Sequence, residues 1–148
     1  MIRKPKISVI MPVYNGEMWL DESVHSILNQ TFDDLELIIV NDASTDNTKE
    51  KILKIKDPRI NFLENKTNLG VAKSLNHSLK NACGLFIARA DVDDISNPNR
   101  FEEQLKVLEN NEDFGMVTNK IEIINKEGEI IGYRNTLLSP EEFYYVLN

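Results

Sequence analysis

The stretch Leu35-Glu-Leu-Ile-Ile-Val40 decides the fold class. It is short, rich in β-branched residues and almost wholly apolar, as a strand is when both faces of its sheet are covered. Helix-length amphipathic segments separate it from three further apolar runs along the chain. These runs are Ile7-Ser-Val-Ile-Met11, Ile60-Asn-Phe-Leu63 and Leu85-Phe-Ile-Ala88. The alternation predicts an α/β fold with a mostly parallel sheet and flanking helices.

The segments between the predicted strands each place apolar residues on one helical face. The three faces are Leu20/Val24/Ile27/Leu28, Val71/Leu75/Leu79 and Phe101/Leu105/Leu108. Ser44 or Thr45 is expected to cap a helix that begins near Asp46, and Pro98 suits a first helical position. Cys83-Gly84 is expected to end the helix that contains Leu75.

The pattern changes after Gly115. Alternating segments at 116–124 and 129–133 are joined by Asn125-Lys-Glu-Gly128, which predicts a β-hairpin. Ser139-Pro-Glu-Glu142 has the form of a capping box that opens a helix shortly before Asn148. We therefore expect one domain over residues 1–148 that is incomplete at its C-terminal end.

Composition excludes several function classes. The chain has 148 residues and a net charge of −7, which disfavours nucleic acid as a partner. The longest apolar run, 37–40, is far shorter than the roughly 20 residues of a membrane helix. Its single cysteine, Cys83, forms no internal disulfide, and His25 and His77 are expected to be surface or packing residues. A reducing, cytoplasmic setting is expected.

Ligands of open parallel sheets bind outside the carboxyl ends of the strands. The loops there read Pro12-Val-Tyr-Asn-Gly16, Asn41-Asp-Ala-Ser-Thr-Asp46, Asn65-Lys-Thr-Asn-Leu-Gly70 and Arg89-Ala-Asp-Val-Asp-Asp94. Asp91 and Asp93 are hard oxygen ligands that suit Mg²⁺ or Mn²⁺, although the same loop also suits a helix cap. Asp42 and Asp46 are open to the same two interpretations. Tyr14 is either a turn aromatic or a stacking partner for a planar base.

Four segments together resemble a known family. Residues 7–15, residues 39–46, Asn68-Leu-Gly70 and Ala90-Asp-Val-Asp-Asp94 are similar, in order and spacing, to family 2 glycosyltransferases. The similarity extends from about Lys6 to Tyr133. It implies a Rossmann-like GT-A nucleotide-binding fold and transfer of a sugar, with inversion, from a nucleotide-sugar to a glycan or other hydroxyl acceptor.

The resemblance also assigns roles to individual residues. Asp42 matches the carboxylate that accepts a hydrogen bond from uracil, Asp91 faces the ribose or the sugar, and Asp93 reaches the divalent metal, Mg²⁺ or Mn²⁺, on the diphosphate. In this assignment both Asp91 and Asp93 belong to the metal site. The other residues carried over to the nucleotide-sugar site are Pro12, Val13, Tyr14, Asn15, Glu17, Asn68, Gly70, Lys73 and Val92.

Some expectations from the resemblance lie outside these motifs. Leu75-Asn76 stands where many relatives have Arg-Asn, and Lys73 is the substitute considered for that cation. The general base is expected beyond Asn148, so the catalytic residue is unknown and this chain alone is expected not to transfer sugar. The whole protein is expected at the inner face of the membrane, without a span in this chain.

Two other function classes compete with this interpretation. A nucleotide-sugar binding module without catalysis would have the same donor motifs, and turnover with an acceptor would separate the two. A signalling receiver domain also has an acidic edge, but it needs an Asp after the third strand, where this chain has Asn65-Lys-Thr-Asn68. The receiver interpretation therefore ranks far below the transferase.

Overall fold

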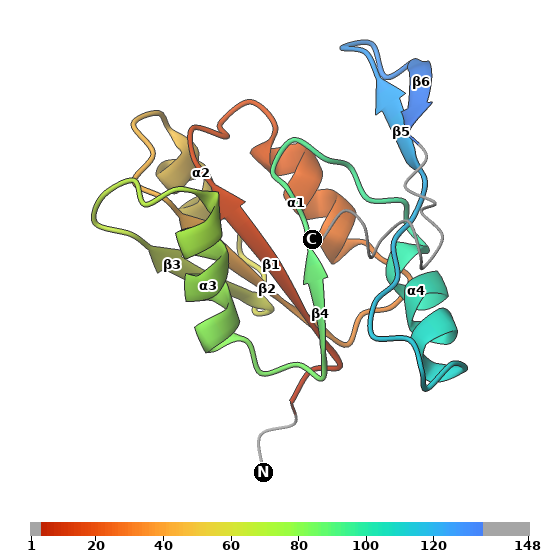
Figure 1. Ribbon diagram of the computed structural model, residues 1–148. Coiled ribbons are helices and arrows are strands. Elements are labelled where there is room, and N and C mark those ends of the chain that lie inside the picture. Colours follow the sequence, from red (N-terminus) through yellow and green to blue (C-terminus); the bar gives the residue numbers. More distant parts are fainter. Residues whose placement is uncertain (1–3, 135–148) are drawn as a thin grey trace, which may run out of the picture. The chain divides into compact units, whose positions relative to one another are not determined.

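The computed structural model describes residues 4–134. Its main sheet has four parallel strands in the order β3-β2-β1-β4 (Figure 1). The strands are β1 (Ile7–Val13), β2 (Leu35–Asn41), β3 (Ile60–Glu64) and β4 (Phe86–Arg89). The parallel α/β sheet predicted from the apolar runs is confirmed, with strand ends shifted by one or two residues.

Helices connect the strands. They are α1 (Leu20–Leu28), α2 (Thr48–Lys54), α3 (Val71–Asn81) and α4 (Arg100–Glu109). α3 packs on β1 and β2, and α1 packs beside α2 (Figure 1). The connections through α1 and α2 run from β1 outward to β3, whereas α3 returns the chain to the other side of β1. Right-handed crossovers therefore place α3 on the opposite face of the sheet from α1 and α2.

The two central strands form the core, as the sequence predicts. In β2, the residues Leu37, Ile38, Ile39 and Val40 are completely buried. The predicted face of α1 is also buried along its whole length. Complete burial of such side chains stabilises the fold by about 1.5–3 kcal/mol each.

The buried face of α3 differs from the predicted one. Val71 and Leu79 are 55% and 44% exposed, so their assignment to a core-facing stripe is wrong. Ser74 and Ser78 are fully buried instead. Leu75, the middle residue of the predicted stripe, does pack against the core of the sheet. The buried face of α3 therefore combines this leucine with two small serine side chains.

Three predicted helix ends are also displaced. α2 begins at Thr48 and not near Asp46, and the carboxylate of Asp46 accepts the backbone N–H of Thr48 at 3.0 Å in place of a Ser44 or Thr45 cap. α4 begins at Arg100, two residues after Pro98, and α3 ends at Asn81. The side chains that accept orphan N–H groups are set by the loop path, which local sequence does not specify.

The chain separates into two compact units, one ending at Glu102 and one beginning at Glu103. The second contains the predicted hairpin, built from β5 (Ile121–Ile124) and β6 (Ile130–Arg134) in antiparallel pairing. Residues 116–120, predicted as part of the first strand, lie outside it. The predicted capping box at 139–142 lies outside the described residues. The expectation of a single domain stays a prediction.

Among residues 4–134, none of the helices combines the length and the apolar character that crossing a bilayer requires.

Candidate functional site

The site lies at the carboxyl ends of β1 and β4, which pair side by side. The chain continues from β1 to β2 on one side of this pair, whereas it reaches β4 on the other side by crossing over the sheet from β3. Such a topological switch point opens a crevice at the carboxyl ends of the strands, where ligands of α/β sheets bind. The predicted site residues on the loops after β1, β2, β3 and β4 are therefore all at this edge.

The loops after β1 and β2 are hydrogen-bonded to each other. The N–H of Asn15 donates to Ser44 Oγ at 3.0 Å, and the N–H of Thr45 donates to Asn15 Oδ1 at 2.8 Å. Asn15 has φ +52° and Ala43 has φ +57°. For alanine this left-handed backbone costs about 1–2 kcal/mol, so the loop after β2 is a strained segment.

Glu17 belongs to this loop junction. Its carboxylate accepts the N–H of Asn47 at 3.2 Å and the side-chain amide of the same residue at 2.8 Å. Its own N–H donates to Asp46 Oδ2 at 3.1 Å. The pKa of Asp46 is lowered, because hydrogen bonds from Thr48 and Glu17 outweigh the raising effect of burial. Asp46 is a residue that the sequence identified only as a candidate helix-capping or site carboxylate, and the structure makes it one of several acceptors that join the two loops.

Gly16 brings the loop after β1 against the loop after β4. A Cβ on Gly16 would lie 2.7 Å from Val13 Cγ1 and 2.8 Å from Val92 Cγ2. Ser23 of α1 adds a second tie, since its hydroxyl donates to the carbonyl of Asp91 at 3.1 Å. The predicted nucleotide segment and the Asp91–Asp93 segment are therefore in contact.

Three carboxylates crowd the loop after β4. Asp91 forms a bidentate ion pair with Arg89, with N–O distances of 3.0–3.1 Å. Asp93 and Asp94 are exposed. The pKa of Asp94 is raised by loss of hydration and then by the charges of Asp93 and Asp91, against the opposing effect of Arg100 and Arg89. The loop thus has an excess of negative charge that its own cations do not balance.

Asp42 has the opposite environment. It is 3% exposed, and its carboxylate accepts the side-chain amide of Asn65 at 2.7 Å and the N–H groups of Leu69 and Gly70 at 2.9 and 2.8 Å. Burial raises the pKa of Asp42, but these hydrogen bonds outweigh it and hold the pKa below its ordinary value. A carboxylate with three fixed donors is ionised and rigid.

The remaining predicted residues lie around Asp42 and the switch point. The carbonyl of Val13, at the end of β1 after half-buried Pro12, accepts the N–H of Asp42 at 2.8 Å. Tyr14 is 50% exposed, as a stacking role requires. Asn68 and Lys73 are exposed, on the loop before α3 and on α3 itself.

An open hollow of about 570 Å³ lies at the carboxyl ends of β2 and β3. Its lining residues are Ala43, Ser44, Glu64, Asn65 and Lys66. Asn65 is the buried partner of Asp42, which sequence reasoning did not single out. The only local signal was its position in the loop that follows the strand predicted at 60–63.

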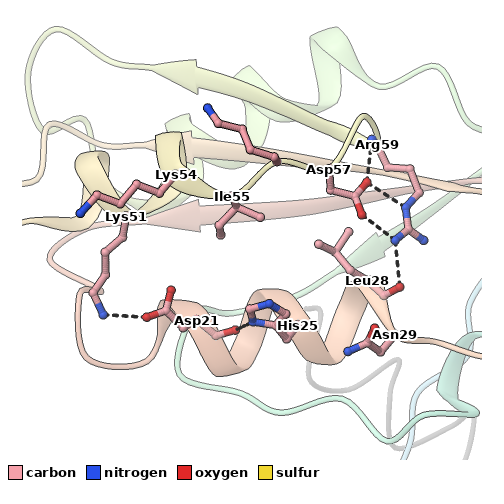
Figure 2. A pocket seen from close by; sticks show the side chains of 10 residues that line it. Asp21, His25, Leu28, Asn29, Lys51, Lys54, Ile55, Asp57 and Arg59 are labelled. Carbon is pink, nitrogen blue, oxygen red and sulfur yellow. Dashed lines mark hydrogen bonds and ion pairs between the residues drawn. The ribbon is translucent and has the colours of Figure 1, made fainter.

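A second groove, of about 600 Å³, lies between α1 and α2 (Figure 2). None of the predicted site residues lines it. Its charged side chains are largely paired, Lys51 with Asp21 and Arg59 with Asp57, each at 2.8 Å. We therefore assign the candidate site to the sheet edge and not to this groove.

The carboxylates of the site suit a metal ion that takes its remaining ligands from the substrate. Among residues 4–134 there is no group of three or more His, Cys, Asp or Glu side chains placed to hold a metal ion. Asp91 and Asp93 provide two carboxylates, and Mg²⁺ is commonly held by one or two carboxylates, with phosphates and water completing its shell. The residues present fit that arrangement.

Comparison with known proteins decides the family. Residues 8–145 match the family model described as Glycosyl transferase family 2. The chain belongs to this family. Its members in the comparisons include a glycosyltransferase of Haemophilus influenzae, 44% identical over 131 residues, which cover 86% of this chain and 41% of that protein. An Escherichia coli relative named UDP-Glc:alpha-D-GlcNAc-diphosphoundecaprenol beta-1,3-glucosyltransferase WfgD is 39% identical over 140 residues, covering 94% of this chain and 53% of that protein.

Solved structures of family members have the same fold. S. aureus TarS 1-349, in complex with UDP-GlcNAc, superposes with a TM-score of 0.67 and 31% identity, over 71% of this chain and 31% of that one. The mannosyltransferase PcManGT from Pyrobaculum calidifontis, in complex with GDP-Man and Mn²⁺, has a TM-score of 0.66 and 26% identity, over 72% of this chain and 33% of that one. The expected GT-A fold is confirmed. The family 2 chain described here spans about half the length, or less, of these relatives.

Proposed function

We propose that this chain binds the donor of a glycosyltransferase, a nucleotide diphosphate sugar with UDP as its nucleotide, in a metal-dependent manner. The observation that carries the proposal is the unbalanced carboxylate loop after β4, in contact with the loop after β1 at the switch point. An acidic edge repels a diphosphate unless a divalent cation lies between them.

The proposed roles follow the geometry of the two sides of the site. Asp93 and Asp91 would hold Mg²⁺ or Mn²⁺, which when bound neutralises charge on the departing nucleotide diphosphate. Asp42, rigid and ionised, would accept a ring N–H of the base, and the exposed ring of Tyr14 would stack on it. Lys73 is proposed as a cation for the nucleotide. The hollow beside Asn65 is the space proposed for the base.

Names of relatives support the donor class and the metal. The TarS structures are complexes with UDP and UDP-GlcNAc, and PcManGT is a complex with GDP-Man and Mn²⁺. The Escherichia coli relative is named for transfer of glucose from UDP-Glc to a sugar on diphosphoundecaprenol. By analogy we propose a glycan acceptor, inversion at the transferred sugar and action of the whole protein at the inner, cytoplasmic face of the membrane. The general base expected beyond Asn148 stays a prediction.

Thermal unfolding with ligands tests the proposal. UDP with Mn²⁺ at 100 times its Kd should stabilise the chain by about 2.7 kcal/mol, a shift of roughly 5–10 °C in melting temperature. The shift should vanish in EDTA and in Asp93→Asn, and should persist in Asp113→Asn, a matched change at an exposed carboxylate outside the strand-end loops. An equal shift in EDTA would reject the metal bridge, and no shift with any nucleotide would reject the donor site.

Turnover separates a transferase from a binding module. Release of UDP from a labelled UDP-sugar is measured with and without glycan acceptors, for this chain and for a version longer by about 100 residues. The proposal expects acceptor-stimulated release by the longer form only. Donor binding without release by either form would identify a nucleotide-sugar binding module.

A further inference from the structure

A network of hydrogen bonds between polar side chains connects α3 to the proposed base subsite. Asn65, the first residue after β3, is 7% exposed and lies between Asp42 and His77. Its side-chain amide nitrogen donates to Asp42 Oδ1 at 2.7 Å and to Ser74 Oγ at 2.9 Å. Its carbonyl oxygen lies 2.8 Å from His77 Nδ1. All four side chains come from elements that meet at one end of the sheet.

The charge of Asp42 determines which atoms of this hydrogen-bond network carry protons. Asp42 is ionised, so it can only accept, and Asn65 must turn its NH₂ group toward it. The oxygen of Asn65 then faces His77 and needs a donor. His77 therefore carries a proton on Nδ1, and a neutral ring has its second nitrogen, Nε2, unprotonated.

The same hydrogen-bond network helps to hold the Asp42 carboxylate in place. Asn65 donates to this carboxylate together with the N–H groups of Leu69 and Gly70 in the loop before α3, and a hydrogen bond from the Ser74 side chain also lowers its pKa. Of the first three donors, two bind Oδ1 and one binds Oδ2, so Oδ2 is the oxygen that we assign to the nucleotide base. Rotation of the Asn65 amide would point an oxygen at Oδ1 and disturb that orientation.

We propose that His77 is a positioning residue, which acts through Asn65 to hold Asp42 and the loop 65–70 in the geometry that receives the nucleotide base. The inference rests on the proposed function, since it takes Asp42 as part of the base subsite. His77 contacts Asn65, whereas the diphosphate side of the proposed site is formed by the loop after β4. Loss of His77 should therefore weaken binding of the nucleoside part and leave diphosphate binding unchanged.

The test compares two probes, UDP and inorganic diphosphate, each with Mn²⁺, by calorimetric titration. His77→Leu removes the donor at similar volume and should weaken UDP binding roughly fivefold, the factor expected for one neutral hydrogen bond, with diphosphate binding unchanged. His77→Gln, whose amide can donate to Asn65, should restore most of the affinity. Lys80→Gln, an exposed change on the same helix, is the control and should bind both probes as the parent does.

Each outcome bears on a separate claim. Parent protein that binds neither probe rejects the proposed function itself. Parent protein that binds UDP, together with unchanged UDP affinity in His77→Leu, rejects the positioning role alone. Equal weakening for both probes also rejects it, because a general loss of fold affects the whole site.

A spectroscopic measurement on the unaltered protein covers the case in which His77→Leu does not fold. The imidazole ¹⁵N shifts of His77 at neutral pH should report the tautomer with the proton on Nδ1. The Nε2-protonated tautomer would overturn the inference, because its Nδ1 could not donate to Asn65.

Discussion

Two carboxylate sites at the same edge of the sheet, one after β2 and one after β4, differ in burial and in hydrogen bonding. Asp42 follows β2, is buried and is held by three donors of its own chain, and its pKa is lowered. Asp91, Asp93 and Asp94 lie within five residues of the end of β4, and the pKa of Asp94 is raised by burial and by its neighbours. The charge of Asp42 is stabilised by donors of its own chain, whereas the negative charge of the loop after β4 is not balanced by its neighbouring cations.

The same residue type at the same edge of the sheet therefore serves two purposes. A buried carboxylate held by donors of its own chain shapes a loop and offers a fixed acceptor. A crowded, exposed set of carboxylates is stabilised when a cation binds to it. Four predictions test this contrast.

The largest effect is expected from Asp42→Asn. The new NH₂ group would face donors in place of an acceptor, leaving buried N–H groups without a partner. We expect the free energy of unfolding to fall by about 2–4 kcal/mol, measured by urea denaturation. Asp93→Asn should change it little in the absence of metal. Equal losses in the two variants would contradict the contrast.

Gly16→Ala should disturb both sites, because Gly16 joins the loops after β1 and β4. The added methyl group would overlap Val13 and Val92, at a cost of about 1–3 kcal/mol in unfolding free energy. Gly115→Ala is the matched control, since its Cβ would meet nothing within 4 Å. UDP affinity should also fall in Gly16→Ala. Unchanged stability and affinity would show that the loops adjust independently.

Asp94→Asn should have a smaller effect of opposite sign. Removing this charge ends the cost of its lost hydration and relieves repulsion by Asp93 and Asp91, so the variant should be more stable than the parent at pH 7 in EDTA. Because Asp94 is exposed and solvent screens its charge, the gain should be a few tenths of a kcal/mol. Urea denaturation at low ionic strength measures it, and 1 M salt should reduce it by screening the part that comes from repulsion. A loss of stability would show that Arg100 and Arg89 outweigh the repulsion.

The smallest effect is a difference in pH dependence. The pKa of Asp42 lies below its ordinary value of 3.8, so its stabilisation is complete above about pH 3.8 and is lost as the pH falls through the folded-state pKa. The pKa of Asp94 lies above 3.8, so its penalty is present above the folded-state pKa and disappears as the pH falls toward 3.8.

Unfolding of the parent, Asp42→Asn and Asp94→Asn is therefore compared between pH 7 and pH 3. The advantage of Asp94→Asn should vanish at a higher pH than the deficit of Asp42→Asn. The reverse order would contradict the assigned environments.

The fold and the location of the site were largely predictable, while the partners of each side chain were not. The apolar run 35–40 and the strand–helix alternation place the loops at one edge, and the Asp91–Asp94 segment is visible as a local cluster. The buried serines of α3 were missed, because the apolar stripe at Val71 and Leu79 suggested another face. Asn65 and His77 carried no motif.

The class of the sheet, its binding edge and the acidic loop follow from the sequence, because periodicity, strand burial and charge spacing are local properties. The different environments of Asp42, held by donors of its own chain, and of the exposed Asp93 emerge only from the folded structure. The donors to Asp42 lie 23–28 residues away, and Gly16 meets Val92 across the switch point. Such contacts depend on the register of strands and the path of loops, and a carboxylate's chemistry follows from the donors that this packing brings to it.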